Sequence, residues 1–326
     1  MTQKLNFVWI DDDPDRKNKA DNLEDALGVS VKFTSIKGSS VDETIENLLN
    51  DTEPDLILLD HSLDQAISKT IKTGSTAATI IHEKWPTCPI ISITGIDSHD
   101  ISIINRSAYE AMFPVNRISE HYVTIKSIAI GFNILKGIQS RDLSSILDFI
   151  NVPEEDRESV SNILPAELKG QNLTDQALFL EIFRWVKNIL LSRPGFLYNE
   201  LWTSTYLGLN EEGFNSVKEM FDDALYKGVF SDPSNPRWWK SRLLEILGEN
   251  IDQFGLPWQI GRQLKPDRSE LYSKCYVSEE PYPEVVAAVD ETPNTEYHPM
   301  KLKYTETHSM NEDLLFFEDL RIMKPA

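Results

Sequence analysis

Four side chains able to do chemistry follow short apolar segments in the first third of the chain. Asp11 and Asp12 end the first apolar run, Asp60 ends DLILL, and Thr94 ends PIISI. In an open parallel sheet, ligands bind at the carboxyl ends of the strands. If these runs are strands of one sheet, we expect the three carboxylates and the hydroxyl to lie in one cluster.

Such a cluster has a definite chemistry. Three carboxylates in one crevice raise one another's proton affinity unless a cation offsets their charge. Mg²⁺ prefers carboxylate oxygens together with retained waters and a phosphate oxygen. A single acidic residue at such a position is explained as a helix cap or a turn residue. The magnesium site is predicted because several such residues occur together, each after an apolar run.

The elements that must position these residues alternate along the first 140 residues, as in an α/β sheet with crossover helices. Strands are predicted at 5–10, 29–33, 55–59, 89–93 and 111–115. Helices are predicted at 14–27, 41–49, 75–85 and 120–135. This rhythm predicts an α/β, flavodoxin-like (βα)5 doubly wound parallel sheet with strand order 2-1-3-4-5.

The segments around the candidate site resemble the receiver domain of two-component response regulators. The resemblance covers residues 1–137 and is carried by IDDDP at 10–14, PDLILLD at 54–60 and PIISITG at 89–95. It implies that Asp60 is the phosphoacceptor and forms an aspartyl phosphate. The phosphoryl donor would be a histidine kinase, a phosphotransfer protein or a small phosphodonor.

The same resemblance assigns roles to the neighbouring groups. Asp11, Asp12 and Asp60 would bind Mg²⁺ together with the backbone carbonyl of Ser62. Thr94 would hydrogen-bond the phosphate and move inward as the phosphate switch. In-line phosphoryl transfer of this kind needs positioning and charge neutralisation more than covalent help from the protein.

The chain departs from the family pattern in two places. The Lys-Pro pair that should end the fifth strand is missing: counting on from Thr94 puts Asn116 there with Arg117 next, whereas aligning on Pro114 puts Phe113 there. Asn116 and Arg117 are therefore candidate stand-ins, although a guanidinium differs from an ammonium in reach and geometry. The loop at 61–73 is longer than in the family, and we expect it to border the site.

Beyond residue 140 the pattern becomes helical. One helix is predicted from Leu178, Ile182, Trp185 or Val186, and Ile189. Others are predicted at 142–150, 155–164, 196–207, 212–227 and 237–251. The strand-like pieces LYSKCYV, EVVAAVD, MKLKYTE and LLFFEDL follow. We predict a receiver-like domain at 1–137, a mainly α-helical domain at 138–260 and a small mixed α+β or β-rich module at 261–326.

Charge bears on what the second part of the chain does. The net charge is −20, and residues 141–326 contribute −13 of it, from 19 Lys and Arg against 32 Asp and Glu. A DNA-binding output should be basic. The most basic helix, PRWWKSRLLEIL at 236–247, is interpreted as a core helix with Trp238, Trp239, Leu243, Leu244 and Leu247 on its apolar face.

No enzymatic output is expected. The sequence has no nucleophile elbow, phosphate-binding P-loop or zinc-protease motif, and Cys88 and Cys275 have no metal-ligand spacing. A site at His298 and His308 is conceivable, but exposed loop histidines explain the pattern better. Without a signal-type or membrane-spanning apolar run, a cytoplasmic protein is expected.

The favoured interpretation is a response regulator-like phosphoacceptor in a two-component phosphorelay. Its output would be binding to a protein partner, or to itself as a homodimer, through the helical region, or it would act as a phosphoryl sink. One alternative is a pseudo-receiver that is never phosphorylated and serves as a scaffold or dimerisation module. The other is a DNA-binding transcriptional regulator, which the acidic charge disfavours.

Overall fold

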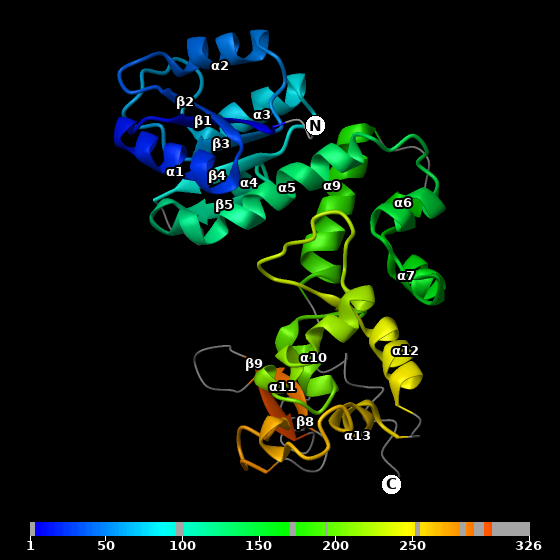
Figure 1. The fold of residues 1–326 in the computed structure, drawn as a ribbon. Helices are drawn as coiled ribbons and strands as arrows, with labels where there is room; N and C mark the ends of the chain where they lie inside the picture. Colours follow the sequence, from blue (N-terminus) through cyan, green and yellow to red (C-terminus); the bar gives the residue numbers. More distant parts are fainter. Residues whose placement is uncertain are drawn as a thin grey trace. The chain divides into compact units, whose positions relative to one another are not determined.

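The computed structural model describes residues 4–95, 101–169, 174–192, 195–251, 255–280, 285–289 and 297–301. The chain forms two compact units, whose elements are labelled in Figure 1. Unit 1 comprises Met1–Phe149, Pro165–Phe183 and Asp232–Ser234. Unit 2 comprises Ile150–Leu164, Arg184–Ser231 and Asn235–Ala326.

Unit 1 is built around a five-stranded parallel sheet. Its strands are β1 (Asn6–Asp11), β2 (Ser30–Ser35), β3 (Leu56–Asp60), β4 (Ile90–Thr94) and β5 (Ala111–Pro114). They pair in the order β2-β1-β3-β4-β5, and every neighbouring pair is parallel. The predicted flavodoxin-like sheet is thereby confirmed.

Helices follow the strands of unit 1 as crossover connections. They are η1 (Pro14–Arg16) with α1 (Lys17–Leu27), α2 (Val41–Asn50), α3 (Gly74–Lys84), α4 (Ile103–Arg106), and η3 (Val115–His121) with α5 (Tyr122–Leu135). Helix α1 packs beside α5, and α2 beside α3 (Figure 1). The short helix α4 was not predicted, because four residues are too few to show a helical period.

The central strands form where the sequence is apolar on both sides of the pleat. All residues of β3 and β4 are buried, as expected for strands covered by helices on both faces. Ile57 and Leu59 of β3 pack in one core cluster with Ile45 of α2 and Ile81 of α3. Leu58 points to the opposite face, because successive side chains alternate across a strand.

Three further helices begin within unit 1: α6 (Leu143–Phe149), α8 (Ala166–Lys169) and α9 (Asp175–Trp185). Phe183 of α9 packs against Phe132 of α5 with ring centroids 5.5 Å apart. A π-helix (Val186–Leu190) continues from α9. Val186 is fully buried but Ile189 is 40% exposed, so the predicted apolar stripe ends one turn early.

Unit 2 is mainly helical, with two short antiparallel sheets. Its helical elements are η4 (Glu154–Asp156), α7 (Arg157–Ile163), α10 (Glu200–Tyr206), α11 (Glu211–Asn215), η6 (Lys218–Ala224), α12 (Lys240–Asn250), α13 (Pro257–Arg262) and η7 (Ser269–Leu271). Strand β6 (Leu197–Tyr198) pairs with β7 (Trp238–Trp239), and β8 (Val285–Val289) pairs with β9 (Tyr297–Lys301). The mainly helical region expected after the sheet is present.

Several details of unit 2 differ from the sequence-based expectations. Trp238 and Trp239 form strand β7 instead of the first turn of a helix, since they pair with β6. The segment LYSKCYV at 271–277 begins with the last residue of η7, Leu271, and continues as irregular backbone and a turn instead of a strand. LLFFEDL and His308 lie outside the described residues. The ring of His298 stacks on that of Tyr276, with the ring centroids 4.2 Å apart.

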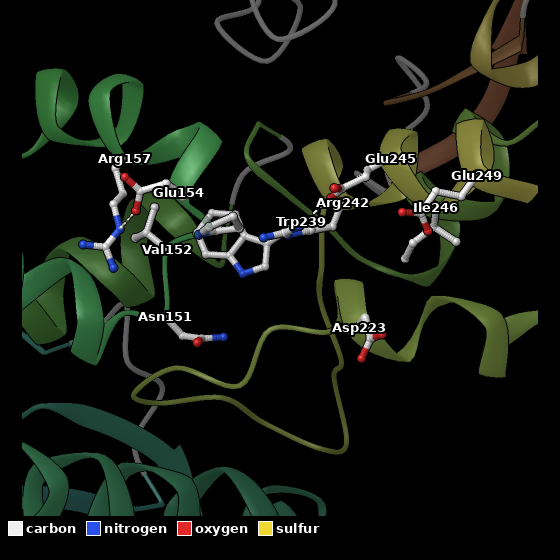
Figure 2. A pocket seen from close by; sticks show the side chains of 11 residues that line it. Asn151, Val152, Glu154, Arg157, Asp223, Trp239, Arg242, Glu245, Ile246 and Glu249 are labelled. Atoms are coloured by element: carbon white, nitrogen blue, oxygen red, sulfur yellow. Dashed lines mark hydrogen bonds and ion pairs between the residues drawn. The ribbon is translucent and has the colours of Figure 1, made fainter.

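Unit 2 also contains a pocket of about 600 Å³ (Figure 2). Its charged lining residues are Glu154, Arg157, Asp223, Arg242, Glu245 and Glu249. Both arginines are neutralised locally, because Arg157 pairs with Glu154 at 3.0 Å and Arg242 pairs with Glu155 and Glu245. The acidic excess makes this pocket a poor site for phosphate groups.

None of the helices in the described part of the chain combines the length and apolar character needed to cross a membrane.

Candidate functional site

The three predicted carboxylates meet at the carboxyl end of the unit 1 sheet. Asp11 is the last residue of β1, Asp12 follows it, and Asp60 is the last residue of β3, the strand paired with β1. Ligand oxygens of the three lie within 4.8 Å of one another. Their exposed fractions are 0%, 4% and 1%, so the cluster is removed from bulk water.

Asp11 is held by groups of its own strand and of the following turn. Its Oδ1 accepts a hydrogen bond from the backbone N–H of Asp13 at 2.9 Å. Its Oδ2 accepts one from the indole Nε1 of Trp9 at 3.1 Å. Because Trp9 is fully buried, this bond fixes the carboxylate against the core of the sheet.

Asp12 and Asp60 are held by the long loop that follows β3. The backbone N–H of Gln65 donates to Asp12 Oδ2 at 2.7 Å, and that of Ser62 donates to Asp60 Oδ1 at 3.2 Å. Ser62 also forms an isolated antiparallel bridge with Thr73. The loop at 61–73 therefore borders the cluster, as the sequence predicted.

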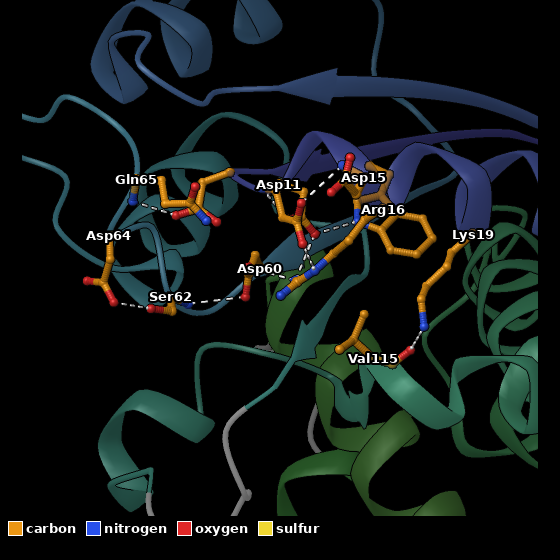
Figure 3. A network of polar contacts seen from close by, with 12 residues as sticks. Asp11, Asp15, Arg16, Lys19, Asp60, Ser62, Asp64, Gln65 and Val115 are labelled. Atoms are coloured by element: carbon orange, nitrogen blue, oxygen red, sulfur yellow. Dashed lines mark hydrogen bonds and ion pairs between the residues drawn. The ribbon is translucent and has the colours of Figure 1, made fainter.

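A basic residue absent from the predicted site completes the cluster. Arg16 Nη1 donates to Asp60 Oδ2 at 2.8 Å and to Asp11 Oδ2 at 2.9 Å (Figure 3). Within the described part of the chain, Arg16 is the one cationic side chain in contact with Asp60. Its position in an acidic turn, DDDPDR, was the available sequence signal, but contact across 44 positions cannot be deduced from that turn.

The environment of the cluster disfavours the ionised forms of Asp11 and Asp60. Burial, the largest cause, and the charges of Asp11 and Asp12 raise the pKa of Asp60 to about 7, although Arg16 and the Ser62 N–H oppose this. Burial also raises the pKa of Asp11 above its ordinary value. The positive charge of Arg16 therefore does not fully offset the factors that raise the pKa values of Asp11 and Asp60.

The backbone beside Asp60 leaves no room for a side chain at Gly74. A Cβ built on Gly74 would lie 2.1 Å from the carbonyl oxygen of Asp60 and 2.8 Å from the Tyr109 hydroxyl. Gly74 N–H also donates to the His61 carbonyl at 2.9 Å. His61 Nδ1 in turn lies 3.0 Å from Tyr109 Oη, and both side chains are buried.

The remaining predicted site residues lie at the end of β4 and after the edge strand β5. Thr94 ends β4, is buried, and sits one residue beyond Ile93, the register partner of Asp60. Asn116 and Arg117 are exposed, and Arg117 is paired with Glu120 at 2.6 Å. Neither of these two residues contacts Asp60 within the described part of the chain.

The donor set fits a hard divalent cation. All three side chains offer carboxylate oxygens. Burial raises the pKa of Asp11 and, together with the charges of Asp11 and Asp12, that of Asp60, and a bound cation would favour the ionised form of both. Asp11, Asp12 and Asp60 are the residues that would bind it.

No family model and no curated protein matches the chain. Solved structures that resemble it include a two-component response regulator from Clostridium difficile, with 23% identity, TM-score 0.31, and coverage of 42% of this chain and 100% of that chain. Another is a Thermotoga maritima response regulator in complex with Mg²⁺-BeF, with 20% identity, TM-score 0.29, and coverage of 36% and 95%. A third is the N-terminal domain of a response regulator/sensory box/GGDEF protein from Carboxydothermus hydrogenoformans, with 17% identity, TM-score 0.33, and coverage of 40% and 96%. Solved receiver domains of response regulators are thus what this chain is similar to, over about 40% of its length.

Proposed function

We propose that unit 1 is a phosphoacceptor receiver in a two-component phosphorelay and that Asp60 accepts the phosphoryl group. The observation that carries the proposal is the placement of Asp60 at the carboxyl end of β3, buried and within 4.8 Å of Asp11 and Asp12. The donor would be a phosphohistidine on a kinase or on a phosphotransfer protein, or a small phosphodonor. The chain would catalyse only its own phosphorylation and dephosphorylation.

In the proposed step, a carboxylate oxygen of Asp60 forms a bond to phosphorus as the phosphorus–nitrogen bond of the donor breaks. The released imidazole nitrogen takes a proton. Mg²⁺ held by Asp11, Asp12, Asp60 and the Ser62 carbonyl would neutralise charge on the phosphoryl oxygens. The Ser62 N–H keeps the Asp60 carboxylate oriented, and Thr94 would hydrogen-bond the product phosphate.

The test is covalent modification. The full chain is incubated with Mg²⁺ and phosphoramidate, a small phosphodonor whose transferable group is bound to nitrogen, and its intact mass is followed. We expect one phosphoryl adduct on the wild type and none on Asp60→Asn. Asp51→Asn is the matched control, because Asp51 is an exposed carboxylate paired with Lys32 and should still permit the adduct. An unmodified wild-type protein contradicts the proposal.

We propose further that the output is binding to a protein or to a second copy, not to DNA. The basic side chains near α12 support this, because each is engaged within unit 2. Arg237 Nε donates to the Leu191 carbonyl at 3.0 Å, Lys240 lies over the rings of Tyr198 and Tyr206, and Arg242 pairs with Glu155. These charges are not arranged as a free phosphate-binding surface. A cytoplasmic location remains part of the proposal.

One observation favours a second candidate, a receiver that is never phosphorylated and acts as a scaffold. Arg16 already bridges Asp11 and Asp60, and this ion pair supplies part of the positive charge that a metal would bring. In that case neither Mg²⁺ nor beryllium fluoride would bind at the cluster. Thermal denaturation with and without both reagents separates the candidates: a rise in melting temperature supports the phosphoacceptor.

A further inference from the structure

The proposed aspartyl phosphate would place additional charge in a cluster that is already acidic. A phosphate monoester carries about 1.5 to 2 negative charges at neutral pH, and catalysis of its transfer depends on neutralising them. The resemblance to receiver domains implies a lysine at the end of the fifth strand for this purpose, whereas β5 ends in Phe113 and Pro114. The positive charge must therefore come from another element.

The basic residues near the end of β5 have other partners, and burial lowers the pKa of His121. The Phe113 ring stacks on His121 with centroids 4.3 Å apart. Arg117 is exposed and paired with Glu120. Lys19 of α1 donates to the Val115 carbonyl at 2.8 Å, so it holds the backbone that follows β5.

Arg16 has both the position and the chemistry to serve. It contacts Asp60 and Asp11 through Nη1 alone, and its side chain is only 17% exposed. Its Nε lies 3.6 Å from Asp13 Oδ2. A planar guanidinium with five donors can bind two phosphoryl oxygens at once, and Nη1 makes both carboxylate contacts of Arg16.

We infer that Arg16 replaces the missing lysine as the phosphoryl-binding cation of this receiver. In the unmodified protein it pairs with the Asp60 carboxylate; on phosphorylation the same guanidinium binds the phosphoryl oxygens attached to Asp60. The charge thus arrives from the turn after β1 instead of from the end of β5. This inference rests on the proposed phosphoacceptor function of Asp60.

The test separates phosphoryl binding from metal binding. Beryllium fluoride with Mg²⁺ mimics the phosphoryl group, and Trp9, whose indole donates to Asp11, reports binding by fluorescence. The dissociation constants of Mg²⁺ alone and of beryllium fluoride at saturating Mg²⁺ are measured for wild type, Arg16→Ala and Arg16→Lys. We expect Arg16→Ala to weaken beryllium fluoride binding roughly 10- to 100-fold, with Mg²⁺ bound at least as tightly as in wild type. Arg16→Lys should recover part of the loss because it restores the charge without the fork.

Two control variants make the result specific. Lys17→Ala removes an exposed neighbouring cation paired with Asp21 and should bind both reagents as wild type does. Arg117→Ala tests the competing stand-in. Beryllium fluoride binding by Arg16→Ala that equals or exceeds that of wild type overturns the inference, and so does a loss in Arg117→Ala that matches the Arg16→Ala loss.

Failure of the underlying function gives a different pattern. A wild type that shows neither a covalent adduct nor beryllium fluoride binding refutes the phosphoacceptor, and the inference falls with it. A wild type that binds normally beside an unaffected Arg16→Ala refutes the inference alone. Thermal melts followed by circular dichroism in Mg²⁺ show whether each variant is folded. If Arg16→Ala does not fold, Arg16→Gln is used in its place, because glutamine keeps part of the length of the arginine side chain without its charge.

Discussion

At the residue scale, the ionisation of Asp60 depends on its immediate neighbours. Asp60 is buried beside two carboxylates and one guanidinium, and burial together with repulsion from the carboxylates raises its pKa to about 7 despite the ion pair with Arg16. Above pH 7 the carboxylate is ionised and nucleophilic, at a cost in stability. That cost is the physical reason for expecting a cation to bind there.

The raised pKa of Asp60 predicts a pH-dependent effect of Asp60→Asn. Because the folded protein holds this proton more tightly than the unfolded chain, Asp60 lowers the free energy of unfolding as pH rises from about 4 to 7. Without Mg²⁺, Asp60→Asn should therefore be more stable than wild type by on the order of 2 kcal/mol at pH 8. The difference should shrink toward pH 5, as measured by urea denaturation in EDTA. A difference independent of pH contradicts the pKa shift.

Gly74→Ala should damage the site through the backbone. The new Cβ would lie 2.1 Å from the Asp60 carbonyl oxygen, so either the end of β3 or the loop at 61–73 must shift. We expect a loss of about 1–3 kcal/mol in stability and slower formation of the Asp60 adduct. Gly248→Ala is the matched control, since nothing lies within 4 Å of its Cβ position. Unchanged stability and adduct formation in Gly74→Ala would show that the contact is absorbed without consequence.

At the element scale, the receiver-like strands follow their sequence pattern closely, whereas the helical region does not. The apolar runs of β3 and β4 are buried on both faces, and this leaves little freedom in where they lie. In unit 2, Trp238 and Trp239 are buried in β7, and helix α12 begins only at Lys240. The buried face of α12 is formed by Leu243, Ile246 and Leu247, without the two tryptophans that the sequence assigned to it.

Adjacent leucines of α12 provide a test of that register. Both Leu243 and Leu244 belong to the apolar face predicted from sequence, but Leu243 is fully buried and Leu244 is 41% exposed. We expect Leu243→Ala to cost about 2–5 kcal/mol and Leu244→Ala no more than about 0.5 kcal/mol. Thermal denaturation of the two variants checks this. Equal losses would favour the broader apolar face and contradict the observed register.

At the scale of the whole molecule, charge limits the kinds of partner. The net charge of −20 is shared by both parts of the chain, with −13 beyond residue 140. The pocket of unit 2 adds four acidic side chains against two arginines that are already paired. Polyanions should therefore be repelled, while a basic or neutral protein surface would not be.

The charge predicts the behaviour of the full chain on DNA. We expect no retention on immobilised double-stranded DNA at about 50 mM salt, where a protein contacting several phosphates would bind tightly. Retention that weakens steeply as salt is raised would support the DNA-binding alternative. The same column run with a phosphodonor and Mg²⁺ tests whether modification of Asp60 uncovers such binding.

The sequence by itself determined the sheet of unit 1 and the acids at its carboxyl edge. Apolar runs of five residues that end in Asp or Thr are local signals, and strand order follows from the flavodoxin-like rhythm. Asp11, Asp12 and Asp60 could therefore be placed together before any coordinates were known. The presence of helices could be predicted equally well, because an amphipathic helix shows a local period of apolar residues.

Only the tertiary structure decided what surrounds those acids. The bridge from Arg16 to Asp60 and the approach of Gly74 to the Asp60 carbonyl join residues whose proximity depends on how separate segments pack. The pairing of β7 with β6 joins two-residue strands about 40 positions apart, too short to show a period. Local pattern selects the elements, whereas the charge balance at Asp60 is set by long-range packing.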